Sequence, residues 1–245
     1  MVNNGLKMNT LKHKTAVVTG ASSGIGFSIA KKMANEGFNI MATARRKERL
    51  DILENEGRVQ TYPQDITTAS SSKTLLDLSI EHFGGCDILI NSAGLIEVGK
   101  IEDIDIDAVC EMVKVKIEAN YRLTYTFLKH FKKQGYGHVI NISSVMGSKI
   151  RETAGAYCGT NYAIEALSEA LRMELAGTNV KISCIEPGLV MTELHDKWET
   201  HPKNLLNITD PLQPIDIAKQ VLYILQQPEH VQIPKLMILP NEHKI

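Results

Sequence analysis

Three glycines, Gly20, Gly24 and Gly26, stand close together between an apolar segment and a segment with helical periodicity. Glycines at such a junction let the backbone approach a ligand closely, and the N-terminus of the following helix favours an anion. The spacing TGxxxGxG differs from the commoner GxGxxG pattern, and a tight turn without a ligand would use the same residues. We expect this turn to hold the phosphates of a dinucleotide.

Two arginines, Arg45 and Arg46, follow the second predicted strand. A carboxylate at this place would hydrogen-bond the 2′-hydroxyl of an adenosine ribose, whereas arginines accommodate a 2′-phosphate. No Asp or Glu lies between Gly37 and Lys47. The sequence therefore favours NADP over NAD. The alternative is that both arginines only begin a solvated helix.

One lysine, Lys116, lies in the middle of the apolar face of a long predicted helix. On a wheel with about 100° per residue, its neighbours within about 60° are Val109, Met112, Val113, Asn120, Leu123 and Phe127. An unpaired ammonium is costly to bury, so we expect its side chain to reach a polar destination. The alternative is that the long side chain carries the charge out to solvent.

The predicted elements alternate between apolar strands and longer helical segments. Strands are expected at 15–19, 39–43, 59–62, 87–91, 138–143, 180–186 and 236–239. Helices are expected at 25–36, 70–83, 105–134, 157–176 and 211–227. Strands that are apolar throughout and are separated by helices indicate a parallel sheet covered on both faces. The prediction is an α/β fold, a doubly wound parallel sheet of about seven strands with helices on both faces.

The whole chain, residues 1–245, is expected to form one domain, because no linker, composition break or internal repeat divides it. The segment 189–210 carries Trp198 and shows little periodicity. It is long for a connector, and long connectors in compact domains are often lids or binding loops. We therefore expect this segment to bind or cover a substrate.

The composition excludes several classes of protein without naming a function. Of 245 residues, 27 are Lys or Arg and 28 are Asp or Glu, so bulk charge gives no case for nucleic acid or an anionic membrane as partner. No apolar run approaches the roughly 20 residues that span a bilayer, and the N-terminal segment lacks the apolar core of a signal peptide. The four cysteines include no CxxC pair, which predicts reduced thiols, no metal site and a cytoplasmic protein.

Several motifs, in order along the chain, resemble those of the short-chain dehydrogenase/reductase family. The turn TGASSGIG at 19–26 is similar to the family's cofactor turn, and NSAG at 91–94 is similar to its NNAG turn. The stretch NISS at 141–144 resembles the strand that ends in the catalytic serine, and Tyr157 follows Ser144 by the family's usual thirteen residues. PGLVMT at 187–192 resembles the PGxVxT cofactor loop. These motifs span nearly the whole chain.

The resemblance implies a single Rossmann-type domain that uses a nicotinamide cofactor without a metal and forms a homodimer or homotetramer. Tyr157 would donate a proton to the substrate oxygen in carbonyl reduction or remove it in alcohol oxidation, and Ser144 would hydrogen-bond that oxygen. The nicotinamide would carry the hydride, and the expected cofactor is NADP(H). The implied cofactor contacts are Gly20, Ser22, Ser23, Gly24, Ile25, Gly26, Arg45, Arg46, Asp65, Ile66, Asn91, Ala93, Gly94, Tyr157, Pro187, Gly188, Val190 and Thr192.

The lysine of the family's YxxxK motif is missing from its usual place. Four residues after Tyr157 stands Asn161, and Lys116 stands where members carry a catalytic asparagine. A cation about 4 Å away, at an effective dielectric of about 20, stabilises a phenolate by roughly 4 kcal/mol, and an asparagine cannot supply this. We hypothesise that the two residue types are exchanged. Lys116 then supplies the cation, and Asn161 hydrogen-bonds to the nicotinamide ribose or to a water.

Three functions stay open at this point. The first is an NADPH-dependent oxidoreductase for a ketone, aldehyde or secondary alcohol, with the Lys116 ammonium within about 4 Å of Tyr157 or Asn161, or linked to them by one water. The second is a dinucleotide-binding protein without turnover, serving as a sensor or scaffold. The third is an isomerase, dehydratase or lyase that uses Tyr157 as acid or base without net oxidation. The expected partner is a small molecule, with neither nucleic acid nor membrane.

Overall fold

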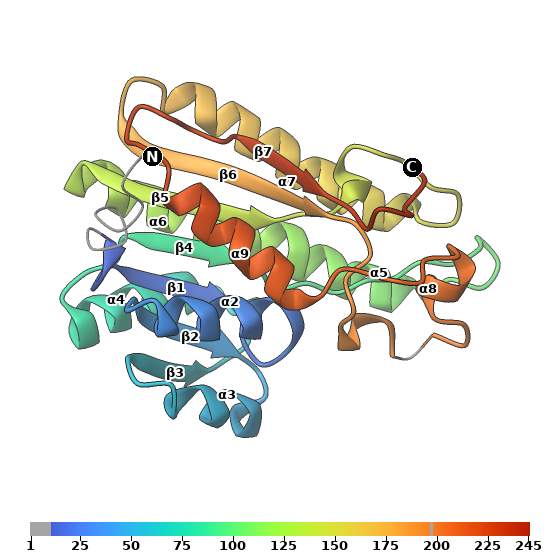
Figure 1. Cartoon of the computed structure of the whole chain (residues 1–245), viewed down its shortest axis with the longest axis horizontal. Helices are drawn as coiled ribbons and strands as arrows, with labels where there is room; N and C mark the ends of the chain where they lie inside the picture. Colours follow the sequence, from blue (N-terminus) through green and yellow to red (C-terminus); the bar gives the residue numbers. More distant parts are fainter. Residues whose placement is uncertain (1–10, 197) are drawn as a thin grey trace.

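Seven parallel strands form one sheet in the computed structural model of the protein, which describes residues 11–196 and 198–245 (Figure 1). From one edge of the sheet to the other, the strands are β3 (Val59–Pro63), β2 (Asn39–Ala44), β1 (Thr15–Thr19), β4 (Ile88–Asn91), β5 (Tyr136–Ile142), β6 (Asn179–Pro187) and β7 (Lys235–Ile238). Each neighbouring pair is parallel. The predicted doubly wound α/β fold is confirmed, and each predicted strand differs from the observed one by no more than two residues at either end.

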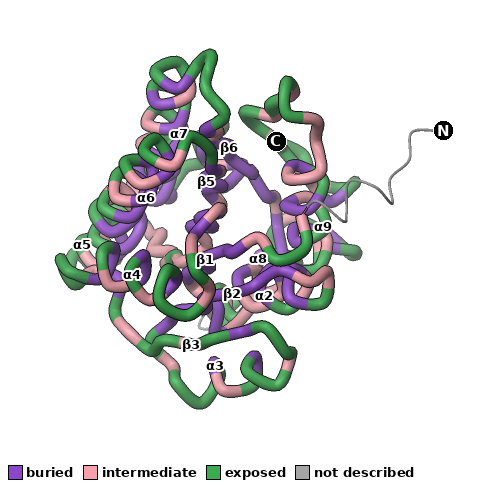
Figure 2. The backbone as a smooth tube through the Cα atoms, turned by 90° about the vertical axis from the view of Figure 1, so that its left-hand side faces the viewer, coloured by how far each residue is buried: buried purple, intermediate pink, exposed green. Residues whose placement is uncertain are grey.

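The inner strands are apolar on both faces because helices cover both faces. Every residue of β1, β2 and β4 is buried. Successive side chains of a strand point to opposite faces, so Ala16 and Val18 join one hydrophobic core while Val17 joins the other. Figure 2 shows these buried strands between two layers of helices.

Each layer of helices packs against one of the two cores. The first layer consists of α2 (Gly24–Asn35), α3 (Lys47–Glu54) and α9 (Pro214–Leu225). The second consists of α4 (Ser71–Phe83), α6 (Asn120–Gln134) and α7 (Gly155–Glu174). The chain leaves β1 toward one edge of the sheet and returns to build the other half from β4. Such a reversal opens a crevice at the carboxyl ends of the strands, where ligands of this fold class bind.

The predicted long helix at 105–134 is interrupted by a π-helical segment. Helix α5 (Ile106–Val113) leads into η1 (Lys114–Ala119), which is π-helical, and α6 follows directly. The i→i+5 hydrogen bonds of a π-helix widen the turn, so a wheel with about 100° per residue does not hold across this segment. Val113, expected on the apolar face with Lys116, is 38% exposed, and this part of the prediction is wrong.

The segment 189–210 contains two short helical pieces, η3 (Glu193–His195) and α8 (Pro202–Leu205). An isolated parallel β-bridge between Val190 and Leu212 joins the start of this segment to the residues that follow its end. Residue 197 of this segment and residues 1–10, on which part of the signal-peptide prediction rests, lie outside the described residues. Within the described parts of the chain, no helix is long and apolar enough to cross a membrane.

Candidate active site

A cavity of about 600 Å³ opens where the carboxyl ends of the strands meet the segment 189–210. The reversal of strand order between β1 and β4 lies at this edge of the sheet. The predicted site residues that line the cavity are Gly20, Ser22, Ser23, Gly24, Ile25, Gly26, Arg45, Arg46, Asp65, Ile66, Ala93, Gly94, Lys116, Ser144, Tyr157, Pro187, Gly188, Val190 and Thr192. Asn91 and Asn161 are not part of this lining.

The glycine turn lies against its neighbours so closely that side chains do not fit. A Cβ at Gly26 would lie 2.4 Å from the carbonyl oxygen of Gly20, and one at Gly20 would lie 2.8 Å from Cα of Ala93. Gly20 also has a φ of +68°, a conformation that favours glycine. The first turn of α2 carries no acidic residue, and its N-cap Ser23 makes no side-chain capping bond. The amide N–H groups at this helix end are therefore free to bind an anion, as a dinucleotide requires.

Arg46 is held by three side chains beside the glycine turn. Its Nη2 donates to Ser23 Oγ at 2.6 Å and to Ser22 Oγ at 3.1 Å, and its Nη1 pairs with Glu193 Oε2 at 2.8 Å. Arg45 also lines the cavity and is exposed. The fold thus brings the Glu193 carboxylate next to Arg46, although the sequence around Arg46 contains no acidic residue between Gly37 and Lys47. The prediction overlooked Glu193 because it lies 147 residues from Arg46 along the chain.

Asp65 and Ile66 line the cavity after the end of β3. The Asp65 carboxylate accepts hydrogen bonds from the Thr67 backbone N at 2.9 Å and from Thr67 Oγ1 at 2.7 Å. These bonds, with a smaller effect of the Arg45 charge, lower the pKa of Asp65. The turn is therefore ordered by an ionised carboxylate, one oxygen of which accepts both hydrogen bonds from Thr67.

Ser144 and Tyr157 line the cavity from two different elements. Ser144 follows β5 and caps the short helix η2 (Val145–Gly147), where its Oγ accepts a hydrogen bond from Met146 N at 3.1 Å. Tyr157 lies in the first turn of α7. Burial raises the pKa of the Tyr157 hydroxyl, and hydrogen bonding with the side chains of Ser144 and Asn161 acts in the opposite direction. The predicted pair is therefore brought together in one buried environment.

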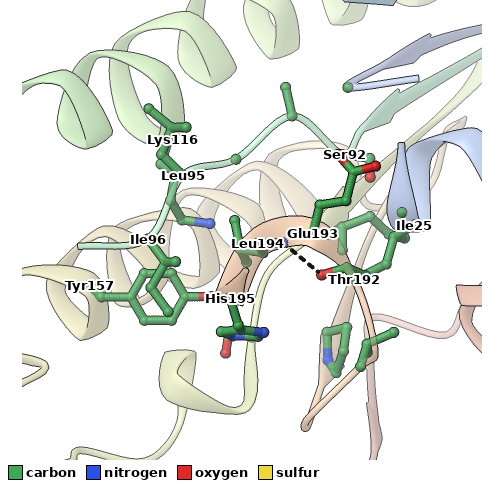
Figure 3. A pocket seen from close by; sticks show the side chains of 18 of the residues that line it. Ile25, Ser92, Leu95, Ile96, Lys116, Tyr157, Thr192, Glu193, Leu194 and His195 are labelled. Carbon is green, nitrogen blue, oxygen red and sulfur yellow. Dashed lines mark hydrogen bonds between the residues drawn. The ribbon is translucent and has the colours of Figure 1, made fainter. Parts of the chain in front are cut away.

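Lys116 reaches the same cavity from the π-helical segment η1. It is 5% exposed, and its Nζ lies 5.3 Å from the centroid of the Tyr157 ring. A Cβ at Gly94 would lie 3.7 Å from this nitrogen, so the ammonium also lies beside the NSAG turn. Burial, without an acidic partner, lowers the pKa of Lys116 to about 8. Figure 3 shows the Lys116 and Tyr157 side chains directed into one cavity, so the lysine does not extend to the outer surface.

Asn161 and Asn91 lie behind the cavity lining. Asn161 is completely buried, and its Nδ2 donates to the backbone oxygen of Tyr157 at 2.8 Å, while its Oδ1 has no hydrogen-bond partner. The Asn91 Nδ2 donates to Asn141 Oδ1 at 2.9 Å and so connects β4 with β5. Both side chains support the backbone that carries the lining residues.

Three further basic side chains line the cavity, and none of them was among the predicted site residues. Arg151 lies in the loop between Ser144 and Tyr157, and His195 lies in η3. His243 lies near the C-terminus, and a Cβ at Gly188 would be 2.7 Å from its Nδ1. No motif spacing links these residues to the others, because only the tertiary fold brings their segments together.

A second set of charged residues lies beside the Ser144 turn, and we call Glu165, Glu186 and Lys235 the buried cluster. Lys235 Nζ lies 3.1 Å from Glu165 Oε2 and 3.1 Å from Glu186 Oε1. Ser148, which directly follows η2, donates a hydrogen bond to Glu186. Burial and the neighbouring Glu186 charge raise the pKa of Glu165. The cluster joins α7, β6 and β7 to the turn that carries the serine.

Three known proteins are similar to this chain over most of its length. An uncharacterized oxidoreductase of Staphylococcus aureus (strain USA300) is 36% identical over 238 residues, which cover 95% of this chain and 100% of that protein. The closed form of serine dehydrogenase complexed with NADP+ has a TM-score of 0.88 at 27% identity, covering 94% of this chain and 96% of that one. A 3-ketoacyl-(acyl-carrier-protein) reductase from Brucella melitensis complexed with NADH shares the fold, with a TM-score of 0.86 at 23% identity and coverage of 95% and 99%.

The family model of the short chain dehydrogenases matches residues 14–203. This range runs from the strand before the glycine turn, through Ser144 and Tyr157, into the segment 189–210. Proteins of this family bind a nicotinamide cofactor, and the crowded glycine turn with its free helix N-terminus fits one. The chain belongs to the short chain dehydrogenase family and is an oxidoreductase.

Proposed function

We propose that the protein is an NADPH-dependent oxidoreductase that interconverts a ketone or aldehyde with the corresponding alcohol. The observation that carries this proposal is the buried Lys116 ammonium beside Tyr157. A protein that only binds a dinucleotide has no use for a cation beside a tyrosine, whereas a tyrosine that exchanges protons does.

The lining residues offer a place for each part of the cofactor. The backbone of Gly20–Gly26 would bind the pyrophosphate, Arg45 and Arg46 the 2′-phosphate, Asp65 the adenine end, and residues 187–192 the nicotinamide end. When bound, the nicotinamide supplies or accepts the hydride. NADP+ in the serine dehydrogenase structure supports the choice of NADP(H).

Tyr157 would hold the proton that the substrate oxygen gains in reduction, and Ser144 would hydrogen-bond the same oxygen. Burial raises the pKa of Tyr157 above its ordinary value near 10, which makes it a poor base unless a positive charge lies nearby. A cation about 5 Å away, at an effective dielectric of about 20, favours the phenolate by roughly 3 kcal/mol, or about two pKa units. With a pKa of about 8, Lys116 keeps most of its positive charge at neutral pH and can supply this interaction.

In the exchanged arrangement of Lys116 and Asn161, Asn161 would contribute hydrogen bonds rather than charge. Its Oδ1 is a buried acceptor without a donor, which is uncommon in folded proteins. A water between this oxygen and the Lys116 ammonium would satisfy it. Asn161 would then hold the proton-carrying groups in place, while Lys116 supplies the charge.

The test is substitution of Lys116 with an assay of reduced-nicotinamide absorbance against a panel of carbonyl compounds. Lys116→Met should lower kcat about 100-fold and leave the KM for NADPH nearly unchanged, because the charge acts on the proton-transfer step. The matched control is Lys114→Met, which removes an exposed lysine from the same π-helical segment and should retain activity. Equal activity of the two variants would refute the role of Lys116.

A double exchange sharpens this test. Lys116→Asn combined with Asn161→Lys should recover more activity than either single change, because the pair then returns to the arrangement seen in the family. The other two functions give different readings in the same assay. A binder without turnover retains NADPH and oxidises none of it with any carbonyl. An isomerase or dehydratase converts its substrate without a change in nicotinamide absorbance.

A further inference from the structure

A single carboxylate, Glu193, forms ion pairs with two arginines at the edge of the cavity. Its Oε2 lies 2.8 Å from Nη1 of Arg46, and its Oε1 pairs with Nη1 of Arg49 on α3. We call these three residues the rim cluster. Arg46 is also the guanidinium that bonds the two serines of the glycine turn. One of the two arginines proposed to bind the 2′-phosphate is thus already paired with a carboxylate from the segment 189–210.

The neighbouring residue, Thr192, lies against the glycine turn as well. A Cβ at Gly24 would lie 3.1 Å from Thr192 Cγ2, so the two residues are in contact. Thr192 Oγ1 accepts a hydrogen bond from Leu194 N at 3.4 Å, which orders the start of η3 (Figure 3). Two consecutive residues, Thr192 and Glu193, therefore attach the segment 189–210 to the turn and to the arginines beside it.

The charges around Glu193 determine how it responds to a phosphate. Its hydrogen bonds to Arg46 and Arg49 hold the pKa of Glu193 below its usual value, so it is ionised at neutral pH. A phosphate at the same guanidinium adds about two further negative charges and repels this carboxylate. A ribose hydroxyl is neutral and leaves the ion pair in place.

We propose that Glu193 sets the preference between NADPH and NADH, by competing with the 2′-phosphate for Arg46. This inference rests on the proposed function and adds to it a specificity-determining residue from the substrate-binding segment. Binding of a 2′-phosphate separates Glu193 from Arg46 and loosens the attachment of η3 to the rim, whereas binding without the phosphate leaves this ion pair in place. The segment 189–210 thereby responds to the kind of cofactor bound.

Two small ligands allow the contribution of the 2′-phosphate to binding to be measured by itself. Adenosine 2′,5′-bisphosphate and adenosine 5′-monophosphate differ only in the 2′-phosphate, and their dissociation constants for wild type and Glu193→Gln are measured by calorimetry. Removal of the competing charge should tighten binding of the bisphosphate about fivefold and leave the monophosphate unchanged. Glu48→Gln is the matched control, because it removes an exposed acid of α3 that has no ion pair in the structure, and both affinities should stay as in wild type.

The chain's one tryptophan gives a second readout that does not depend on activity. Trp198 lies in the segment 189–210, five residues after Glu193. In wild type its fluorescence should change on binding of the bisphosphate and not of the monophosphate. In Glu193→Gln this difference should disappear, because the ion pair that the phosphate would break is already absent.

The outcomes separate this inference from the proposed function. Weaker binding of the bisphosphate by Glu193→Gln, or equal changes for both probes, would overturn the competition while leaving the oxidoreductase proposal in place. If wild type bound neither probe and neither NADPH nor NADH, the proposed function and the inference would both be overturned. A gain confined to the bisphosphate, with loss of the Trp198 response, would support the inference.

Discussion

The rim cluster lies at the edge of the cavity and the buried cluster lies beside the Ser144 turn, and the two differ in how far water reaches their charged side chains. The three side chains of the rim cluster are between 38% and 44% exposed. The two carboxylates of the buried cluster are 9% and 0% exposed, and only the lysine between them reaches solvent, at 45%. Both clusters join segments that lie far apart in the sequence.

The exposure of each cluster to solvent determines whether a ligand can replace one of its charged partners. An exposed ion pair contributes little to stability, since water and salt compensate its separated charges, so a ligand can replace one partner. A buried charge that loses its partner has no such compensation, so the arrangement is fixed once the chain has folded. The exposed cluster is therefore suited to recognising a cofactor, and the buried one to holding the Ser144 turn in place.

The largest effect is expected from Lys235→Met, which leaves two buried carboxylates without their cation. The free energy of unfolding should fall by about 3 kcal/mol, as measured by urea denaturation. Lys235→Arg keeps the positive charge, so its free energy of unfolding should fall much less. Glu193→Gln should change stability by less than about 0.5 kcal/mol. Equal losses in Lys235→Met and Glu193→Gln would contradict the contrast between the clusters.

Lys116 provides the opposite case, a buried cation without an acidic partner. Its pKa is about 8 in the folded chain against an ordinary 10.5, so between these values the unfolded chain binds more protons. Stability should therefore rise with pH across this window, by up to roughly 3 kcal/mol, because folding then no longer requires burial of the charge. Unfolding of wild type and Lys116→Met from pH 7 to 10.5 measures this difference. Parallel curves for the two proteins would show that the amine is not desolvated.

A smaller effect is expected at the rim, where Arg46→Gln removes the proposed phosphate-binding guanidinium. The dissociation constant for NADP+ should rise about tenfold because the charge partner of its 2′-phosphate is lost. The dissociation constant for NAD+ should hardly change. Calorimetry at low and high salt checks this, since the wild-type preference for NADP+ should shrink as screening increases. Equal weakening of both cofactors would mean that Arg46 supports the turn rather than the 2′-phosphate.

Much of the site could be predicted because its motifs are local. The glycine turn, the NSAG turn and the PGLVMT loop each follow a strand directly, and a parallel sheet brings the carboxyl ends of its strands to one edge. Nearly all of the predicted site residues therefore line one cavity. The prediction failed at Val113, because a wheel of constant pitch cannot foresee a π-helical segment.

The sequence by itself determined the order of strands and helices, the parallel sheet and the turn that fits an anion, because hydrophobic periodicity and glycine placement act over a few residues. The exchanged motifs already suggested that Lys116 lies near Tyr157, but only the tertiary structure decided that Glu193 pairs with Arg46 and that Lys235 joins two buried carboxylates. These contacts join residues that are far apart in the chain. They depend on which helices cover the sheet and on where each connecting segment packs in the fold. A pattern of a few neighbouring residues does not specify either.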